Sequence, residues 1–294
     1  MSPSSPTSVS RGREWNRLLA GVERGTLLLT GPSGSGKSTL ARWLVGQLAR
    51  DLERVALVDC DPGQSSVGVP GCLGLALTGP WEAPAASWFV GAATPARHLL
   101  PIVVGAARLA EHARARGAQA VVLDAPGLAE GPLARVLHYH LAASTGVDQV
   151  IAIAAAESSD ESGELLALLT TPDRRVSRVA PAAGARERSQ EERRSHREAR
   201  FAAHLAGAST RLFSPRRVIG PDWRLGGGGP VALGTVLGLL GGDGFCLGLG
   251  VVEEVHEDRL AVSTRVTDVP VVRLIAADFR LDGDRRELPA AAAG

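Results

Sequence analysis

The chain has 294 residues, which is enough for one large or two modest domains with a substantial buried core. Its formal net charge of +1 creates no global field that would attract nucleic acid or an anionic membrane, so any basic site must be local. The three cysteines, Cys60, Cys72 and Cys246, have no CxxC spacing. This argues against a disulfide framework or a zinc site and favours a cytoplasmic protein.

Apolar runs and helical patterns alternate along the first half of the chain. Residues 1–12 form a Ser- and Pro-rich segment without an apolar core, so we expect a disordered leader and no secretory signal. A short helix is predicted over 13–22. Strands are predicted at 26–30, 55–61, 88–95, 118–127 and 148–156, and helices over 38–50, 96–116 and 130–144. This order predicts an α/β fold with a doubly wound, mainly parallel sheet.

The second half has a different character. Residues 174–200 contain nine Arg and four Glu. Short β-type runs at 245–255, 259–266 and 271–281 predict a small β-rich module. Residues 231–252 are long enough to span a membrane, but Asp243 between two glycines is typical of a hairpin turn. We therefore expect no membrane span.

Lys37 is the only lysine of the chain, although Lys and Arg together number 32. Because an ammonium is a compact point charge and a guanidinium a wide planar fork, we expect Lys37 where only the compact group fits. It lies in Gly31-Pro-Ser-Gly-Ser-Gly36-Lys37-Ser38, which fits the P-loop pattern G-x-x-x-x-G-K-[ST] between an apolar strand and a helix. The loop would hold nucleotide phosphates, and Ser38 would bind Mg²⁺. The predicted nucleotide-binding residues are Gly31, Ser33, Gly34, Ser35, Gly36, Lys37, Ser38 and Thr39.

A pair of carboxylates, Asp59 and Asp61, follows the next predicted strand. There they would lie near the γ-phosphate. Either could hold Mg²⁺ through water or accept a proton from an attacking hydroxyl.

Asp124-Ala-Pro-Gly127, at another predicted strand end, resembles the D-x-x-G element of GTPases. Guanine selection in those proteins uses an Asn-Lys-x-Asp element. This chain cannot contain one, because Asn16 is its only asparagine and its only lysine belongs to the P-loop. The GTPase interpretation is therefore excluded.

An arginine-rich segment carries a helix start signal. Ser189-x-x-Glu192 is a capping box, so a helix is predicted to begin near residue 190. Arg193, Arg197 and Arg200 then fall at i, i+4 and i+7 on one face. Such a segment could close over a triphosphate, and a solvated, salt-bridged helix is the alternative interpretation.

Four elements together resemble the polynucleotide 5′-hydroxyl kinase family, which includes the kinase subunit of the eukaryotic mRNA cleavage and polyadenylation machinery. The resemblance covers about residues 24–207. Besides the P-loop, the matching stretches are Asp59-Cys-Asp61-Pro-Gly-Gln64 with Pro70-Gly71, Phe89-Val-Gly-Ala-Ala-Thr94-Pro95, Asp124-Ala-Pro-Gly127, and Arg188-Ser189 with Arg193, Arg194, Arg197 and Arg200.

The resemblance implies transfer of the γ-phosphate of ATP to the 5′-hydroxyl end of RNA or DNA, with ATP and Mg²⁺ as cofactors. Asp61 would be the general base, Lys37 would act on the phosphates, and Arg188 and Arg193 would stabilise the transferring group. Ser38 and Asp59 are the expected metal residues. Gln64 and Thr94 would help to place the acceptor end or the metal waters, and Gly127 and Arg197 are also expected to bind the substrate.

The sequence pattern and the resemblance together predict a domain plan. A P-loop kinase domain would occupy residues 13–210, with an arginine-rich lid at about 174–207. A small β-rich domain would follow at 211–288, and residues 289–294 would form a frayed tail. Two other functions stay open at this point: an ATP-binding adaptor without chemistry, and a kinase acting on a small molecule such as a nucleoside. Protein partners are not indicated by the sequence.

Overall fold

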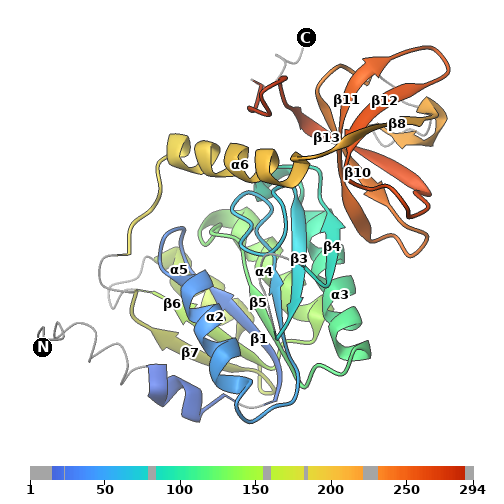
Figure 1. The fold of residues 1–294 in the computed structure, drawn as a ribbon. Helices are drawn as coiled ribbons and strands as arrows, with labels where there is room; N and C mark the ends of the chain where they lie inside the picture. The colour runs from blue at the N-terminus through green and yellow to red at the C-terminus, as the bar shows by residue number, and fades with distance from the viewer. Residues whose placement is uncertain are drawn as a thin grey trace, which may run out of the picture.

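The protein is represented by a computed structural model, which describes residues 15–22, 24–78, 84–154, 160–181, 185–220 and 231–288. The leader predicted at 1–12 and the tail predicted at 289–294 lie outside these residues. Of the predicted first helix, residues 15–20 are helical. Two sheets form the body of the molecule, and a long helix lies between them (Figure 1).

The first sheet has seven strands in the order β4-β3-β2-β5-β1-β6-β7. The central strands β2, β5, β1 and β6, with β7 at one edge, are parallel, whereas β3 and β4 run antiparallel to their neighbours. The strands are β1 (Gly25–Thr30), β2 (Val55–Asp59), β3 (Cys72–Leu77), β4 (Ala86–Phe89), β5 (Ala120–Asp124), β6 (Gln149–Ile153) and β7 (Arg175–Val179). The predicted doubly wound, mainly parallel sheet is confirmed.

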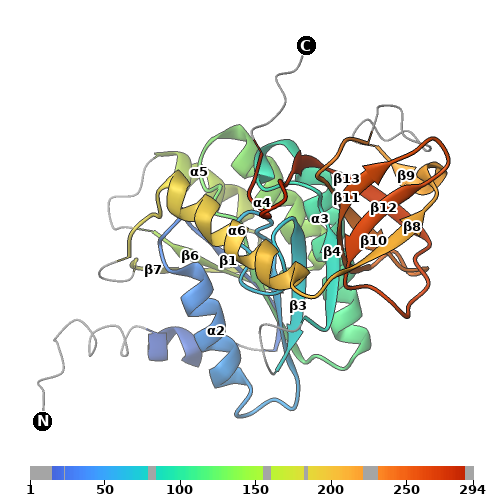
Figure 2. The ribbon, with the colours of Figure 1, turned by 45° about the horizontal axis from the view of Figure 1, so that its top comes forward.

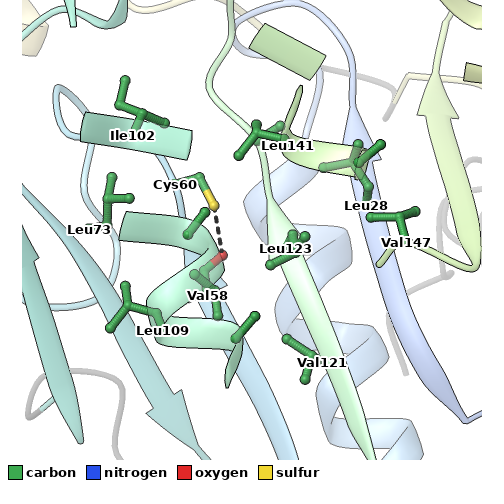
Figure 3. Packing of buried hydrophobic residues seen from close by; sticks show 14 of the residues in the cluster. Leu28, Val58, Cys60, Leu73, Ile102, Leu109, Val121, Leu123, Leu141 and Val147 are labelled. Carbon is green, nitrogen blue, oxygen red and sulfur yellow. Dashed lines mark hydrogen bonds between the residues drawn. The ribbon is translucent and has the colours of Figure 1, made fainter. Parts of the chain in front are cut away.

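Helices cover both faces of this sheet, which explains why its central strands are continuous apolar runs. On one face, Leu28 and Leu123 pack against α3 (Leu99–Ala115), α4 (Gly131–Thr145) and α5 (Asp160–Leu169) (Figure 3). On the other face, Leu27 and Leu57 pack against α2 (Lys37–Leu48). The loops at the carboxyl ends of the strands are thereby held on a rigid base.

The strand predicted over 88–95 is wrong after Phe89. β4 ends at Phe89, because the backbone N–H groups of Val90 and Gly91 both donate to the Gly71 carbonyl and Gly91 has a φ of 77°. The chain then forms a loop and a short 3-10 helix, η1 (Pro95–Arg97), before α3. The strands β3 and β7, the first two residues of β4, and the helix α5 were not predicted. β7 is a partly exposed, Arg-containing edge strand and α5 begins with polar residues, whereas β3 is itself a buried apolar run that was passed over.

The second sheet has six strands in the order β8-β12-β11-β10-β13-β9. They are β8 (Ser209–Phe213), β9 (Val218–Ile219), β10 (Thr235–Leu240), β11 (Cys246–Val255), β12 (Leu260–Thr264) and β13 (Arg273–Arg280), with the 3-10 helix η2 (Pro215–Arg217) before β9. β10 and β11 pair as the predicted hairpin around Asp243. No helix in the described part of the chain is long and apolar enough to cross a membrane.

Two boundaries of the predicted domain plan differ from the structure. The boundary between residues 210 and 211 falls inside β8, whose five residues all pair with β12 of the second sheet. The predicted lid at 174–207 includes β7, which pairs with β6 as an edge strand of the first sheet. β7 was not predicted because its Arg-rich sequence does not form an apolar run.

The helix α6 (Gln190–Leu205) connects the two sheets and crosses the end of the first sheet (Figures 1 and 2). Its predicted capping box is present. The Ser189 hydroxyl accepts from the Glu192 backbone N–H at 3.1 Å, and the Glu192 carboxylate accepts from the Ser189 N–H at 2.8 Å. Only its C-terminal half is buried, through Phe201 and Leu205.

Candidate active site

The P-loop leaves β1 at the carboxyl end of the first sheet. Gly31, Gly34 and Gly36 have φ values of 148°, 75° and 101°, in the region that favours glycine. Such a backbone turns successive N–H groups toward one point, which suits an anion. Gly36 also caps α2, so the positive end of the helix dipole faces the same loop. The predicted phosphate cradle is therefore formed in the structure.

The lone lysine lies inside this cradle. The Lys37 ammonium donates to the carbonyl oxygens of Gly31 and Pro32, both at 2.8 Å, and the side chain is buried. Burial lowers the pKa of Lys37, and the carboxylates of Asp124 and Asp61 oppose that shift. The compact ammonium thus fits between two backbone oxygens of its own loop.

Two buried carboxylates meet beside the lysine. Asp59 and Asp124 end the neighbouring strands β2 and β5 and are register partners, with exposures of 1% and 2%. Burial and, after it, the charge of the nearby Asp124 raise the pKa of Asp59 to about 7. Burial raises the pKa of Asp124 to about 6, against the lowering effects of a hydrogen bond from Ser38 and the charge of Lys37.

Asp59 and Asp124 differ in whether their carboxylate oxygens already have hydrogen-bond partners. Asp59 Oδ1 accepts from the Asp61 backbone N–H at 3.0 Å, while its Oδ2 accepts from the backbone N–H groups of Ser66 and Val67. Asp124 Oδ1 is buried and has no hydrogen-bond partner in the described part of the structure. Asp59, the expected metal residue, therefore organises its own loop, and Asp124 has the oxygen available to a ligand.

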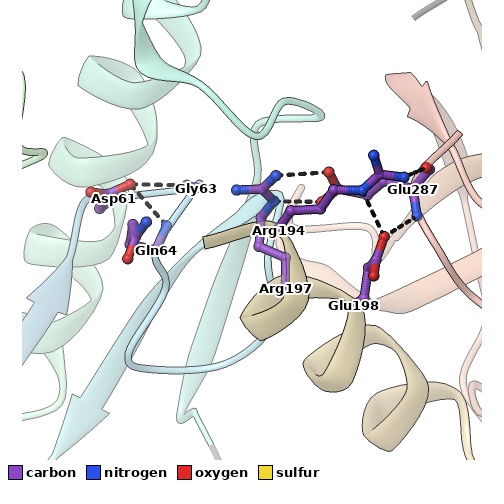
Figure 4. Close-up of polar contacts among 7 residues, drawn as sticks. All are labelled: Asp61, Gly63, Gln64, Arg194, Arg197, Glu198 and Glu287. Atoms are coloured by element: carbon purple, nitrogen blue, oxygen red, sulfur yellow. Dashed lines mark hydrogen bonds and ion pairs between the residues drawn. The ribbon is translucent and has the colours of Figure 1, made fainter. Parts of the chain in front are cut away.

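Asp61 lies in the 60–71 loop that follows β2. Its Oδ1 accepts from the backbone N–H groups of Gly63 at 2.9 Å and Gln64 at 3.0 Å (Figure 4). No partner is found for Oδ2 among the described residues. The side chain is half-buried and its charge acts on both Lys37 and Asp124. The predicted general base thus lies near the P-loop with one oxygen available.

The loop of residues 90–98 lies against the 60–71 loop. A Cβ on Gly63 would come within 2.2 Å of the Ala93 carbonyl oxygen, so only glycine permits this approach. Thr94, the next residue, is exposed and precedes η1. On the other side of the P-loop, a Cβ on Gly127 would lie 2.9 Å from Ser33. Thr94 and Gly127 therefore border the site on different loops.

The arginine segment reaches the site at its N-terminal end. A Cβ on Gly34 would lie 2.5 Å from the Arg186 carbonyl oxygen, so this segment touches the P-loop. The Arg188 guanidinium donates to the Gln64 side-chain oxygen at 3.3 Å. Arg193 is paired with Glu187 at 2.9 Å. Arg188 is thus joined to the loop of the predicted base, and Arg193 is paired with Glu187, the residue that precedes Arg188.

Arg197 is placed differently from the expectation that it contacts the acceptor. Its guanidinium forms two bonds with the Glu287 carboxylate, at 2.5 and 2.7 Å, and both side chains are 14% exposed. Arg194 donates to the Glu287 carbonyl, and Glu198 accepts from the Glu287 backbone N–H (Figure 4). These contacts, which we call the Glu287 latch, fasten α6 to the chain after β13.

Most of the expected site residues are brought to one end of the first sheet. The P-loop, Asp59, Asp61 and Gln64 lie there, and Arg188 contacts Gln64. Arg197 lies instead in the Glu287 latch. Asp124 was missing from the predicted site. Its position at the end of a predicted strand was the available signal, because parallel strands place their carboxyl ends together.

Comparison with known proteins gives several archaeal relatives, two of which match more than two thirds of this chain. The chain is 27% identical to the polyribonucleotide 5′-hydroxyl-kinase of Thermococcus kodakarensis, over 85% of this chain and 86% of that protein. It is 25% identical to the polyribonucleotide 5′-hydroxyl-kinase of Pyrococcus furiosus, over 72% of this chain and 60% of that protein.

The fold resembles a solved structure of wild-type Clp1p in complex with Pcf11p, with a TM-score of 0.72. The identity is 13%, and the superposition covers 95% of this chain and 80% of the other. Residues 31–207, more than half of the 294, match the family model of the mRNA cleavage and polyadenylation factor CLP1 P-loop. The resemblance inferred from the sequence is confirmed, and the chain belongs to this CLP1 P-loop family.

Proposed function

We propose that the protein is an ATP-dependent polynucleotide 5′-hydroxyl kinase, which transfers the γ-phosphate of ATP to the 5′-hydroxyl end of RNA or DNA. The observation that carries the proposal is the position of Asp61. A carboxylate oxygen without a partner in the described structure lies near a P-loop lysine and a second buried acid. The names of the archaeal relatives point to the same reaction for those proteins.

ATP would bind with its phosphates in the curved P-loop. The backbone N–H groups of residues 33–39 and the N-terminus of α2 would hold the β- and γ-phosphates. Lys37 would exchange its two carbonyl partners, Gly31 and Pro32, for phosphate oxygens. A phosphate is the stronger partner because its oxygens are charged.

Ser38 and Asp124 fit a Mg²⁺ ion. The two side chains are hydrogen-bonded to each other, and Asp124 Oδ1 is a buried acceptor without a partner in the described chain. Hydroxyl and carboxylate oxygens are the ligands this ion prefers. When bound there, Mg²⁺ would neutralise charge on the β- and γ-phosphates. Asp59 would act on this site indirectly, through the loop that its carboxylate organises.

Asp61 would accept the proton of the 5′-hydroxyl as the hydroxyl oxygen attacks the γ-phosphorus. The new phosphate ester bond forms while the bond between the γ-phosphorus and the bridging oxygen breaks, and ADP leaves. The two backbone N–H groups on Oδ1 would keep the carboxylate oriented during the transfer. The acceptor end would lie beside the packed 60–71 and 90–98 loops, in reach of Gln64 and Thr94, and Gly127 would border the P-loop at Ser33.

Arg188 and Arg193 would supply positive charge to the transferring group. Arg188 is already joined to Gln64, so a small movement of its segment would bring the guanidinium to the phosphates. Arg193 would first release Glu187. Arg197 would contribute to the acceptor only after release from Glu287, and in the latched state it serves to position α6.

The test is transfer of labelled γ-phosphate from ATP to matched 5′-hydroxyl RNA and DNA oligonucleotides. Asp61→Asn should lower transfer by at least about 100-fold, since general base catalysis contributes 10²–10⁴-fold. ATP affinity should stay near that of the unmodified protein, because the P-loop is intact. Lys37→Ala should abolish both phosphate transfer and ATP binding.

Each contrary outcome points to a different function. Undiminished transfer by Asp61→Asn would contradict the assigned base. ATP binding without transfer to any oligonucleotide would indicate a nucleotide-binding adaptor. If nucleosides inhibit phosphate transfer and oligonucleotides do not, the protein is a small-molecule kinase.

A further inference from the structure

Two cysteines far apart in the sequence lie side by side between the two sheets. Cys72 is the first residue of β3 in the first sheet, and Cys246 is the first residue of β11 in the second. Their side chains are close enough for Cys246 to act on the Cys72 thiol, and both thiols are free. They belong to one apolar cluster that also contains Phe89, Phe201 and Leu249.

The two thiols differ in access to solvent. Cys72 is 1% exposed, whereas Cys246 is half-buried. The hydrogen bond with Cys246 and burial both raise the pKa of the Cys72 thiol well above its ordinary value. Cys246 also donates to the Gly248 carbonyl oxygen at 3.3 Å. A reagent in solution would therefore meet Cys246 before Cys72.

The third cysteine provides a contrast within the same chain. Cys60 is fully buried in the core of the first sheet, where its thiol donates to the Val58 carbonyl oxygen at 3.7 Å (Figure 3). It belongs to a different apolar cluster from Cys72 and Cys246. Proximity and partial access thus select one pair out of three cysteines.

We propose that Cys72 and Cys246 form a reversible disulfide that links the two sheets when the protein meets a low-molecular-weight disulfide. Cys246, as its thiolate, attacks one sulfur of the small disulfide and releases one small thiol. Cys72 then gives up its proton and displaces the second small thiol from Cys246. Both cysteines are oxidised, the small disulfide is reduced to two thiols, and the reaction reverses with excess thiol.

The bond would connect parts of the site to the second sheet. Cys72 directly follows Gly71, whose carbonyl oxygen accepts the N–H groups of Val90 and Gly91 and so joins the 60–71 and 90–98 loops. Cys246 lies under the C-terminal half of α6, where the His204 ring accepts from the Leu249 N–H at 3.3 Å. The disulfide would fix the base of both loops to the second sheet.

The bond should also raise resistance to heat. It would close a long loop between β3 and β11, which restricts the unfolded chain. We expect the oxidised protein to melt about 5 °C or more above the reduced protein. The proposal does not depend on the kinase assignment, because neither thiol count nor melting temperature measures phosphate transfer.

The experiment starts from the fully reduced whole chain, freed of reductant and incubated with excess 2-hydroxyethyl disulfide. Free thiols are counted after unfolding, and the intact mass is recorded. We expect the count to fall from three to one, the mass to fall by two hydrogen atoms without an adduct, and peptide mapping to join Cys72 to Cys246. The melting temperature should rise and return after reduction.

Matched variants distinguish the pair from general oxidation. Cys60→Ser should lose both remaining thiols and keep the rise in melting temperature. Cys246→Ser should keep both remaining thiols and show no rise, and Cys72→Ser should show no rise either. Three free thiols in the treated protein, a lasting small-molecule adduct on Cys246, or a bond that includes Cys60 would each overturn the proposal. If Cys72→Ser does not fold, Cys246→Ser at the less buried position decides alone.

Discussion

At the scale of single residues, the site depends on what surrounds each carboxylate. Asp59, Asp61 and Asp124 lie near one another, yet their hydrogen bonds differ. Asp59 has backbone donors on both oxygens, Asp61 on one, and Asp124 Oδ1 has none among the described residues. The residue type is the same in all three, so the chemistry available to each follows from its neighbours.

The pKa of Asp124 gives a pH-dependent prediction for stability. Burial raises this pKa from 3.8 to about 6 in the folded protein. The folded state therefore retains a proton that the unfolded chain has released. The stabilisation from that proton is fully present below about pH 4 and is lost as the pH rises through about 6. Asp124→Asn has no titrating group at this position, so the variant does not lose this stabilisation as the pH rises.

We expect the stability of Asp124→Asn relative to the unmodified protein to increase by about 2 kcal/mol between pH 4 and pH 8. The comparison should be made by chemical unfolding across that range. Using the difference cancels the opposite contributions of His138 and His204, whose pKa values burial lowers to about 4. Removal of the Asp124 charge also lowers the pKa of Asp59, which acts in the same direction as the expected increase. A difference that stays constant with pH would contradict the assigned shift.

At the scale of elements, α6 is held at its ends, by the Glu287 latch and by a hydrogen bond that the Arg200 guanidinium donates to the Gly68 carbonyl oxygen. Its first turn is closed by the capping box, and its last turn is buried through Phe201 and Leu205. Between them, the charged helix depends on the Glu287 latch, in which the Arg197 and Glu287 side chains are mostly buried. A buried charge that loses its partner is costly, so the latch is the sensitive point of α6.

Glu287→Gln should therefore loosen α6. The amide cannot accept two charge-assisted bonds from Arg197, and we expect a loss of about 1–3 kcal/mol in the free energy of unfolding. Hydrogen exchange should speed up in α6 more than in β1. The matched control is Glu254→Gln, which breaks an exposed contact with His256 and should change stability by less than about 0.5 kcal/mol.

At the scale of the whole molecule, the two sheets share an apolar cluster. Phe89 of β4 packs so closely over Gly238 of β10 that a Cβ there would lie 2.3 Å from its ring. The Asp278 carboxylate and backbone N–H bind His98 and Gly91, respectively, beside the same strand. The second sheet thus supports the 90–98 loop directly, and the two sheets should unfold together.

Phe89→Ala tests that coupling. Phe89 is 4% exposed, and its removal would leave a cavity between the sheets. We expect the free energy of unfolding to fall by about 3–5 kcal/mol in a single cooperative transition. Leu212→Ala is the control. Leu212 is 64% exposed, so its replacement should leave the free energy of unfolding nearly unchanged. Two separate transitions in the unmodified protein would contradict joint unfolding.

Prediction from the sequence was most successful for features that depend on a few neighbouring residues. The P-loop, the central strands and the capping box were predicted from local patterns, because glycine conformation, continuous apolar runs and cap chemistry act over a few residues. Contacts between distant residues carry no such local signal. The latch joins Arg197 to a glutamate 90 positions later, so its side chain was assigned to the acceptor.

The same limit explains the other differences. Asp124 lacked a place in the predicted site because its free oxygen depends on pairing between β2 and β5. Cysteine spacing argued against a disulfide framework, whereas folding brings Cys72 to Cys246 from opposite sheets. β7 was hidden because three arginines between residues 174 and 178 mask a short, partly exposed edge strand.

The lone lysine has a consequence for covalent labelling. Amine-reactive reagents have only one side-chain target in this protein, and it lies within the nucleotide cradle. Burial lowers the pKa of Lys37, which favours the neutral amine that such reagents attack, while burial also restricts their access. The extent of side-chain labelling therefore reports the opening and occupancy of a single site, without background from surface lysines.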